Sequence, residues 1–445
     1  MKNLITRTII TIAAAMGFVL SSYAQAPEWD TVGGGTDNVV YALATYNGQL
    51  YAGGFFTHAS NVNANYMALW NGNAWNGMNA SPNSYVMTLT GTDSALFAGG
   101  FFNTAGAASS NNIGVYADSN WSGMDGGISG PASEINAMVS YNGMLYAGGS
   151  FTMAGADSAN NVAVWNGKQW APLGNGLNNV VNALAVYNGA LYAGGYFSLP
   201  GGTSNIAMWN GTEWVGVGNS VNNVVSAMIV YNGDLYVGGC FTRAGKVKTN
   251  EIAKWNGTEW SSVGSGLSVK GTINAFAIYN GKLVAGGFFD SAGGAPAANI
   301  ANWDGNNWNT MCKGVNNAAY ALAVYNNALY AGGLFNTAGN VNANYIATYF
   351  EPSTITGINE TTVESNTKVY PNPGKGVFNF QADGQWLIAN SRIEVYNVSG
   401  EKVCQHSFST PRTSLDLSGQ PAGTYFYRIT SEQGEAIANG KLIIE

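Results

Sequence analysis

The stretch VVNALAVYNGALYAGGYF (Val180–Phe197), followed by IAMWNGTEWVGVG (Ile206–Gly218), is the clearest copy of a repeat that fills most of this 445-residue chain. Apolar residues flank Asn188-Gly189, a pair that favours a two-residue type I′ turn between two antiparallel strands. A second pair of strands is centred on Asn210-Gly211. We therefore predict four strands per copy, which is the make-up of one blade of a β-propeller.

A Gly-Gly pair ends the second strand of each copy and recurs at intervals of 44 to 49 residues. The pairs are Gly53-Gly54, Gly99-Gly100, Gly148-Gly149, Gly194-Gly195, Gly238-Gly239, Gly286-Gly287 and Gly332-Gly333. A fourth-strand tryptophan also occurs seven times, but its first copy, Trp29, precedes the first Gly-Gly pair. We therefore expect residues 28–33 to supply the outer strand of the last blade, because that pairing leaves no open sheet edge at the seam.

The predicted fold is all-β, with a seven-bladed propeller over residues 27–350, a linker over 351–367 and a small Ig-like β-sandwich over 368–445. The repeat resembles the kelch-type propeller, in which a strand ending in Gly-Gly precedes an aromatic residue and then a tryptophan. Here these two residues, as in Trp165 and Trp170, are closer together than in kelch repeats. The resemblance implies a fold and no activity. A solenoid is the alternative, although it would not need the permuted first strand.

The first 24 residues have the features of a signal peptide. Lys2 and Arg7 form a positive start, and the apolar run Thr8–Leu20 is too short for a membrane span. We expect cleavage after Ala24. No later stretch reaches the roughly 18 apolar residues of a spanning helix, so no transmembrane segment is expected in the mature chain.

Residues 368–445 contain several short motifs in a fixed order. They are Tyr370-Pro371-Asn372-Pro373, the Val-Ser-Gly turn that ends at Gly400, the Leu-Asp-Leu-Ser segment 415–418, and Gly423-Thr424-Tyr425. This segment closely resembles the type A C-terminal sorting domain of the type IX secretion system of Bacteroidota. The resemblance implies a periplasmic intermediate, export by the type IX machinery, and either release or attachment at the outer-membrane surface.

The composition restricts the chemistry that the chain can perform. Charged residues are only 9% of the chain and the net charge is −7, so a nucleic-acid partner is not expected. Two histidines and three scattered cysteines, which we interpret as buried thiols without disulfides, do not suit a metal centre. Phosphate-binding, calcium-binding and nucleophile-elbow motifs are missing from the sequence. We therefore expect no metal, no cofactor and no catalytic residue.

Candidate binding residues are those that vary between copies, because the periodic tryptophans are explained by blade packing. One set is expected at the start of the innermost strands, near the mouth of the central channel: Tyr41, Tyr85, Asn136, Asn182, Asn274 and Tyr320. A second set lies in a loop that the first and last copies share: Asn63, Tyr66, Asn342 and Tyr345. Side-chain amides and tyrosines suit the recognition of hydroxyl groups.

These observations favour a secreted or surface-displayed propeller that binds a glycan or an extracellular protein without catalysing a reaction. A carbohydrate-active enzyme is one alternative, and its sign would be a carboxylate pair facing the channel mouth. A structural surface protein without a ligand is another. In that case the asparagines would serve the loop backbone and the tyrosines would cap the core.

Overall fold

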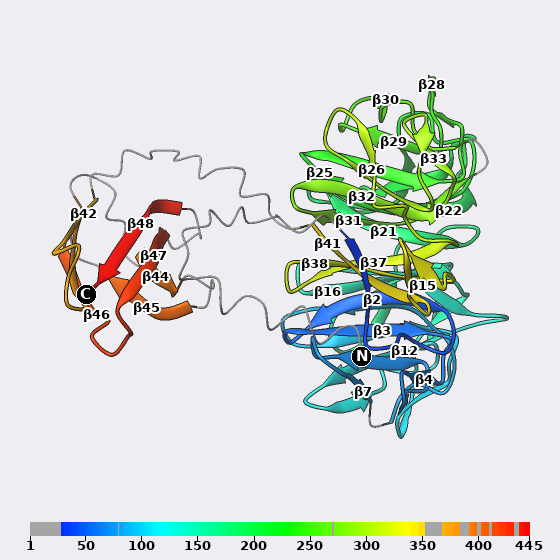
Figure 1. Cartoon of the computed structure of the whole chain (residues 1–445). Coiled ribbons are helices and arrows are strands. Elements are labelled where there is room, and N and C mark those ends of the chain that lie inside the picture. Colours follow the sequence, from blue (N-terminus) through cyan, green and yellow to red (C-terminus); the bar gives the residue numbers. More distant parts are fainter. Residues whose placement is uncertain are drawn as a thin grey trace. The chain divides into compact units, whose positions relative to one another are not determined.

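The computed structural model describes residues 28–78, 80–268, 271–351, 367–382, 391–397, 402–408, 412–430 and 436–445. Every regular element in these ranges is a β-strand, which confirms the all-β prediction. The chain divides into two compact units, Met1–Pro352 and Ser353–Glu445 (Figure 1). The predicted signal peptide, Gly400 and nearly all of the predicted linker lie outside the described residues.

In the described part of the first unit, seven four-stranded antiparallel sheets follow one another, and we number them in chain order. Sheet 1 contains β2 (Val40–Tyr46), β3 (Gln49–Gly54), β6 (Met67–Trp70) and β7 (Trp75–Gly77), and sheet 2 contains β8 (Val86–Gly91), β9 (Leu96–Gly100), β12 (Ile113–Ala117) and β13 (Asn120–Ser122). Sheet 3 contains β15 (Glu134–Tyr141), β16 (Met144–Ser150), β19 (Val162–Trp165) and β20 (Trp170–Pro172). Sheet 4 contains β21 (Val181–Tyr187), β22 (Ala190–Ser198), β23 (Ser204–Trp209) and β24 (Trp214–Gly216).

The remaining sheets repeat this order. Sheet 5 contains β25 (Val225–Tyr231), β26 (Asp234–Gly239), β29 (Ile252–Trp255) and β30 (Trp260–Ser262). Sheet 6 contains β31 (Thr272–Tyr279), β32 (Lys282–Phe288), β35 (Ile300–Trp303) and β36 (Trp308–Thr310). Sheet 7 contains β37 (Ala319–Tyr325), β38 (Ala328–Gly333), β41 (Ile346–Phe350) and, as its outer strand, β1 (Glu28–Thr31).

Sheet 7 therefore combines the two ends of the repeat region. β1 pairs antiparallel with β41, and Trp29 lies opposite Tyr349 in the register. The first strands of the sheets contact one another in the order β2, β8, β15, β21, β25, β31 and β37, and β37 in turn contacts β2. The series of contacts between first strands thus returns to its starting point.

Glycine and asparagine are abundant because the repeat needs them at fixed points. In sheet 4, Asn188 (φ 47°) and Gly189 (φ 76°) both adopt the left-handed backbone that a type I′ turn requires. The Gly-Gly pair serves close packing instead, since a Cβ atom added to Gly148 would lie 2.5 Å from Cγ1 of Val181 in the next sheet. The missing side chain lets neighbouring sheets approach each other.

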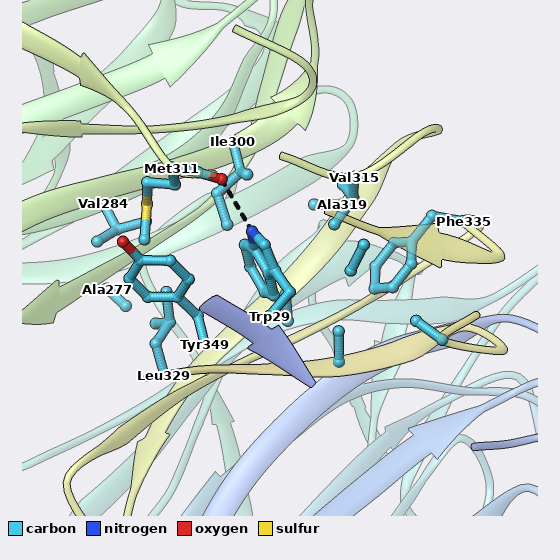
Figure 2. Packing of buried hydrophobic residues seen from close by; sticks show 14 of the residues in the cluster. Trp29, Ala277, Val284, Ile300, Met311, Val315, Ala319, Leu329, Phe335 and Tyr349 are labelled. Atoms are coloured by element: carbon cyan, nitrogen blue, oxygen red, sulfur yellow. Dashed lines mark hydrogen bonds between the residues drawn. The ribbon is translucent and has the colours of Figure 1, made fainter. Parts of the chain in front are cut away.

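The outer-strand tryptophans connect neighbouring sheets. Trp29 in sheet 7 is 4% exposed, and its indole N–H donates a hydrogen bond of 2.8 Å to the carbonyl of Met311, which follows sheet 6 (Figure 2). Its ring packs on Tyr349 with the ring centroids 5.1 Å apart. Trp75 and Trp170 make the equivalent bond to the preceding sheet, also at 2.8 Å. A buried indole with a paired N–H is a packing residue.

Short hairpins that the sequence did not predict follow six of the seven Gly-Gly pairs in the described residues. They are β4 (His58–Ala59) with β5 (Val62–Asn63), β10 (Thr104–Ala105) with β11 (Ala108–Ser109), β17 (Met153–Ala154) with β18 (Asp157–Ser158) and the extra strand β14 (Ile128–Ser129), β27 (Arg243–Ala244) with β28 (Val247–Lys248), β33 (Ser291–Ala292) with β34 (Ala295–Pro296), and β39 (Thr337–Ala338) with β40 (Val341–Asn342). Strands of two residues are too short to show a period of two in the sequence.

The second unit has two antiparallel sheets and one core. One sheet contains β42 (Thr367–Tyr370), β43 (Val377–Ala382) and β46 (Arg412–Asp416), and the other contains β45 (Lys402–Phe408), β44 (Ser391–Asn397), β47 (Gly423–Thr430) and β48 (Ala436–Ile444). Phe380 from the first sheet meets Tyr427 from the second with ring centroids 5.0 Å apart. Both belong to one cluster of buried apolar residues, so the core lies between the two sheets.

Candidate functional site

A β-bulge interrupts the first strand of every sheet in the first unit. The bulged residues are Tyr41, Met87, Asn136, Asn182, Ser226, Asn274 and Tyr320. All seven are partly exposed. A bulge takes one side chain out of the regular alternation of the strand and turns it in a new direction. The seven residues are therefore structurally equivalent, with one in each sheet.

The register corrects one of the sequence-based assignments. Tyr85 was aligned with Tyr41, but Val86 pairs with the second glycine of its Gly-Gly pair, as the residue before Tyr41 does. Met87 is therefore the counterpart of Tyr41, and Tyr85 lies two residues earlier. The misalignment arose because the hairpin turn of sheet 2 lacks Asn-Gly, so the count back to the strand started from the wrong residue.

Bulged side chains contact their neighbours in adjacent sheets. The rings of Tyr41 and Tyr320 lie with their centroids 5.6 Å apart. The Asn136 amide donates a long hydrogen bond of 3.5 Å to Oδ1 of Asn182, and Asn274 donates to a backbone carbonyl of sheet 7 at 3.2 Å. The structure thus brings together the two tyrosines of sheets 7 and 1, and separately two of the predicted asparagines.

Five aromatic rings gather on sheets 7, 1 and 2, and we call Tyr320, Tyr41, Tyr85, Phe55 and Tyr66 the aromatic cluster. Tyr85 packs edge-on against Phe55 at 4.4 Å, and Phe55 stacks with Tyr66 at 6.2 Å. Phe55 is 37% exposed and Tyr85 is 36% exposed. Burial raises the pKa of Tyr41, and the neighbouring Tyr320 and Tyr85 raise it further. Tyr85 therefore lies beside this group although its register was misassigned.

The two loop tyrosines occupy an unusual backbone position. Tyr66 (φ 62°) and Tyr345 (φ 68°) are both left-handed. Sheets 2, 3, 4 and 6 have asparagine at the equivalent point, with φ between 61° and 66°: Asn112, Asn161, Asn205 and Asn299. Asparagine tolerates this conformation far better than tyrosine does. The backbone therefore does not explain the choice of tyrosine at these two positions.

The asparagines at this left-handed position serve the fold. Asn205, for example, is buried and donates its amide to the carbonyl of Val221, which leads into sheet 5, at 3.0 Å. By contrast, Asn63 in β5 and Asn342 in β40 are exposed. These last two are the predicted loop asparagines whose side chains face solvent near the loop tyrosines.

Sheet 5 has a glutamate at the left-handed position. Glu251 is 2% exposed, and its Oε2 has no hydrogen-bond partner among the described residues. Burial raises the pKa of Glu251 to about 8. Burial also raises the pKa of the neighbouring Cys240 thiol, and the Glu251 carboxylate adds to that effect. Burial therefore favours the neutral form of both groups, and Glu251 is a buried carboxyl that the fold leaves without a full set of hydrogen bonds.

The described residues contain no group of three or more His, Cys, Asp or Glu side chains that could hold a metal ion. Nδ1 of His58 lies 3.2 Å from Oδ2 of Asp37, and both side chains are largely exposed. The three cysteines, all described, form no disulfide. Cys240 and Cys404 are only partly buried and Cys312 is exposed, so the prediction of buried thiols holds in part for the first two and is wrong for Cys312. Its left-handed turn after β36 (φ 44°) places it at the surface.

The predicted sorting residues hold the end of the chain in the second unit. The Asn372 amide donates to the carbonyl of Lys441 at 2.6 Å, and its Oδ1 accepts from the N–H of Ile443 at 2.9 Å. Tyr425 donates its hydroxyl to the carbonyl of Pro421 at 2.8 Å. The other described members of the set are exposed: Tyr370, Pro371, Pro373 and Gly423. Asn372 therefore fixes β48 while its neighbours face solvent.

Residues 368–445 match the model of the family described as the secretion system C-terminal sorting domain. This chain carries a type IX sorting domain. The sorting domain indicates interaction with the type IX machinery and export to the cell surface or the extracellular space. Among the described residues, none forms a helix with the length and apolar character needed to cross a bilayer.

Comparison with curated proteins found no match. Among solved structures, the extracellular domain of BT4673 from B. thetaiotaomicron is 12% identical, with a TM-score of 0.50 over 86% of this chain and 48% of that chain. PorZ, described as an essential surface component of the type IX secretion system of Porphyromonas gingivalis, is 15% identical, with a TM-score of 0.46 over 93% and 60%. The designed protein Ika8 is 14% identical, with a TM-score of 0.46 over 73% and 99%. This chain spans about half the length of the first two.

Proposed function

We propose that the first unit is a seven-bladed β-propeller, exported by the type IX system, that binds a glycan or an extracellular protein without catalysis. The seven equivalent sheets, the closed order of contacts between their first strands and the pairing of β1 with β41 support this fold. The propeller covers residues 27–350. A cleaved signal peptide over 1–24, a linker over 351–367 and an Ig-like sorting sandwich over 368–445 complete the chain.

The aromatic cluster is the observation that carries the binding proposal. Its rings lie on three neighbouring sheets, and Phe55 and Tyr85 are more than one-third exposed. Tyr66 keeps a left-handed backbone where other sheets use asparagine, and strain that persists at such a point supports a functional role for its side chain. Asn63 and Asn342 are also exposed, and their amides would add hydrogen-bonding groups beside the outer strands β7 and β1.

A carbohydrate-active enzyme is the weaker candidate on this geometry. Hydrolysis of a glycosidic bond uses two carboxyl groups roughly 5 to 9.5 Å apart. None of the seven bulged residues is acidic. Glu134, which accepts a hydrogen bond of 3.3 Å from Asn136, is a single carboxylate beside this set. The described residues at the innermost strands therefore favour binding over hydrolysis.

Replacement of Tyr41, Tyr85 and Tyr320 together with alanine tests this function. The full chain and the variant would be applied to arrays of oligosaccharides and extracellular matrix proteins. We expect the variant to lose about tenfold or more in affinity for the ligand that the full chain selects. Tyr141→Ala, at the tight-turn end of β15, is the control and should bind as the unchanged chain does. If the folded triple variant bound the ligand as the unchanged chain does, the aromatic cluster would not be the binding site.

A further inference from the structure

The residue that follows each Gly-Gly pair is large, apolar and exposed in five of the seven sheets. These residues are Phe55, Phe101, Tyr196, Phe288 and Leu334, which are 37%, 49%, 56%, 55% and 42% exposed. The next residue is a buried phenylalanine in every sheet: Phe56, Phe102, Phe151, Phe197, Phe241, Phe289 and Phe335. Successive side chains of an extended chain point to opposite sides. One ring therefore builds the core while its neighbour faces solvent at a repeated place.

Three of the exposed rings border cavities that are built from equivalent positions. In sheet 2 a cavity of about 320 Å³ is lined by Phe101, Asn83, Asn103 and Asn112. In sheet 4 a cavity of about 300 Å³ is lined by Tyr196, Asn178, Ser198 and Asn205. In sheet 6 a cavity of about 820 Å³ is lined by Phe288, Ser268, Asp290 and Asn299. Each combines one ring with polar side chains from the same three places in the repeat, and these are amides or hydroxyls except for Asp290 in sheet 6.

The buried asparagine of each cavity is fixed by the fold. Asn112, Asn205 and Asn299 are 7%, 6% and 8% exposed. Each donates its amide N–H to a carbonyl of the connection that enters the next sheet, at 2.9, 3.0 and 2.7 Å. A polar group that is already oriented loses little freedom when a ligand binds. The cavities therefore have a preorganised wall.

The wall beside the ring is preorganised in the same way. Oδ1 of Asn178 accepts from the N–H of Ser198 at 2.9 Å, and its amide donates to the Ser198 hydroxyl at 2.9 Å. In sheet 2 the amide of Asn83 donates to Oδ1 of Asn103 at 2.7 Å. These bonds hold hydroxyl and amide groups next to an exposed ring without any ligand present.

The chemistry of these walls selects a class of ligand. No charged side chain lines the cavities of sheets 2 and 4 among the described residues, whereas Asp290 and Lys313 line the larger cavity of sheet 6. A sugar ring offers an apolar C–H face to an aromatic ring and hydroxyl groups to amides and hydroxyls. Volumes of about 300 Å³ lie at the lower end of small-ligand sites. We infer that sheets 2, 4 and 6 each hold one binding site for a neutral saccharide unit.

The other sheets lack a free ring at this point. Phe55 of sheet 1 is packed between Tyr66 and Tyr85. Sheets 3 and 5 have Ser150 and Cys240 after the Gly-Gly pair, and sheet 7 has an aliphatic leucine. The sites thus fall in alternate sheets and share no residue with the aromatic cluster. Three weak sites on one chain bind a polymer of repeated sugar units far more tightly than a single unit.

The experiment counts sugars per chain. The full chain is screened on an array of neutral and charged oligosaccharides, and the smallest neutral saccharide that binds is titrated by calorimetry. We expect three sugars per chain, two for Phe101→Ala, Tyr196→Ala or Phe288→Ala, and none for the triple variant. Apparent affinity for the corresponding polysaccharide should fall about tenfold or more in the triple variant.

Two control variants should leave the count of sites unchanged. They are Leu334→Ala, at the equivalent point of sheet 7, and Tyr141→Ala, which lies outside the cavities and the aromatic cluster. The triple alanine variant of Tyr41, Tyr85 and Tyr320 is measured beside them to separate this inference from the proposed function. If an alanine variant unfolds, serine at the same position, which sheet 3 carries naturally, replaces it. Binding of no neutral saccharide, a count of one per chain, or three sites in the triple variant of Phe101, Tyr196 and Phe288 would overturn the inference. Loss of all binding in the tyrosine variant alone would support the aromatic cluster and refute the repeated sites.

Discussion

Two sets of aromatic residues recur around the first unit and have opposite environments. The outer-strand tryptophans are buried in most sheets, and several donate their indole N–H to the preceding sheet, as Trp29 and Trp170 do. The rings that follow the Gly-Gly pairs, such as Phe101 and Tyr196, are about half exposed and border cavities. Repetition alone therefore does not separate packing residues from binding residues. The two sets are distinguished by their burial and by whether the polar groups beside the ring are paired within the fold or line a cavity.

The largest effect on stability is expected from the buried set. Trp170→Ala removes an almost fully buried indole and its hydrogen bond to the Met124 carbonyl. The free energy of unfolding of the first unit, measured in urea, should fall by about 3–5 kcal/mol. Tyr196→Ala, from the exposed set, should change it by less than about 1 kcal/mol. Similar losses for both variants would abolish the distinction between the two sets.

Glu251 is another buried position of the repeat, and its Oε2 has no hydrogen-bond partner among the described residues. Burial raises the pKa of Glu251 in the folded state to about 8 from its ordinary value of 4.5, so the native state holds a proton that the unfolded state releases between these values. Stability is therefore expected to decline as the pH rises from 4.5 to 8. Glu251→Gln should remove this decline and be more stable than the unchanged chain at pH 9 by roughly 5 kcal/mol.

Unfolding in urea at pH 5 and pH 9 measures this effect. Glu251→Asn should be stabilised further, because asparagine suits the left-handed backbone and can donate as Asn205 does to Val221. Glu213→Gln, at an exposed turn of sheet 4, is the control and should keep the pH dependence. An unchanged pH dependence in Glu251→Gln would show that this carboxyl is not the group responsible.

The Gly-Gly pair sets the spacing between sheets, and one substitution tests it. A Cβ on Gly148 would meet Cγ1 of Val181 at 2.5 Å, so Gly148→Ala must push two sheets apart. We expect a loss of about 1–3 kcal/mol in the free energy of unfolding. Gly419→Ala, where a Cβ meets nothing within 4 Å, should be close to neutral for the second unit. A neutral Gly148→Ala would indicate that the sheets are not close-packed.

A smaller effect is expected at Asn222, whose amide oxygen holds the loop backbone and whose amide nitrogen donates to the Thr242 hydroxyl at 3.0 Å. Oδ1 of Asn222 accepts from the N–H groups of Thr242 and Arg243, both at 2.9 Å. Asn222→Ala should cost about 1 kcal/mol of stability, measured by thermal and urea unfolding. Asn222→Asp, which keeps the acceptor as Asp37 does in sheet 1, should recover most of it. Equal losses in both variants would argue against this role of the acceptor.

The strands of the first unit could be predicted because turns and strand ends use distinctive residues. The turn at Asn188-Gly189 needs a left-handed backbone, and the close packing at Gly148 leaves no room for a side chain. Both positions therefore restrict which residues can occur there, and this restriction is visible in the sequence. The sorting segment was recognised from motifs such as Tyr370-Pro371-Asn372-Pro373, and the family match confirms it.

The candidate site could be predicted only in part. Met87 was missed because sheet 2 lacks the Asn-Gly turn from which the register was counted. The sequence does not show that Phe101 is exposed and Phe102 is buried, because both are phenylalanines at the end of a strand. The left-handed backbone of Tyr66 and Glu251 depends on loop hydrogen bonds that no local pattern reveals.

The repeated saccharide sites can be tested by a crystal structure of the full chain soaked with the neutral saccharide selected on the array. We expect sugar rings stacked on Phe101, Tyr196 and Phe288, with hydroxyl groups directed toward the neighbouring amides, and unchanged tryptophan packing beneath. Sugar bound only at the aromatic cluster, or no sugar at any of these three rings at saturating concentration, would contradict this expectation.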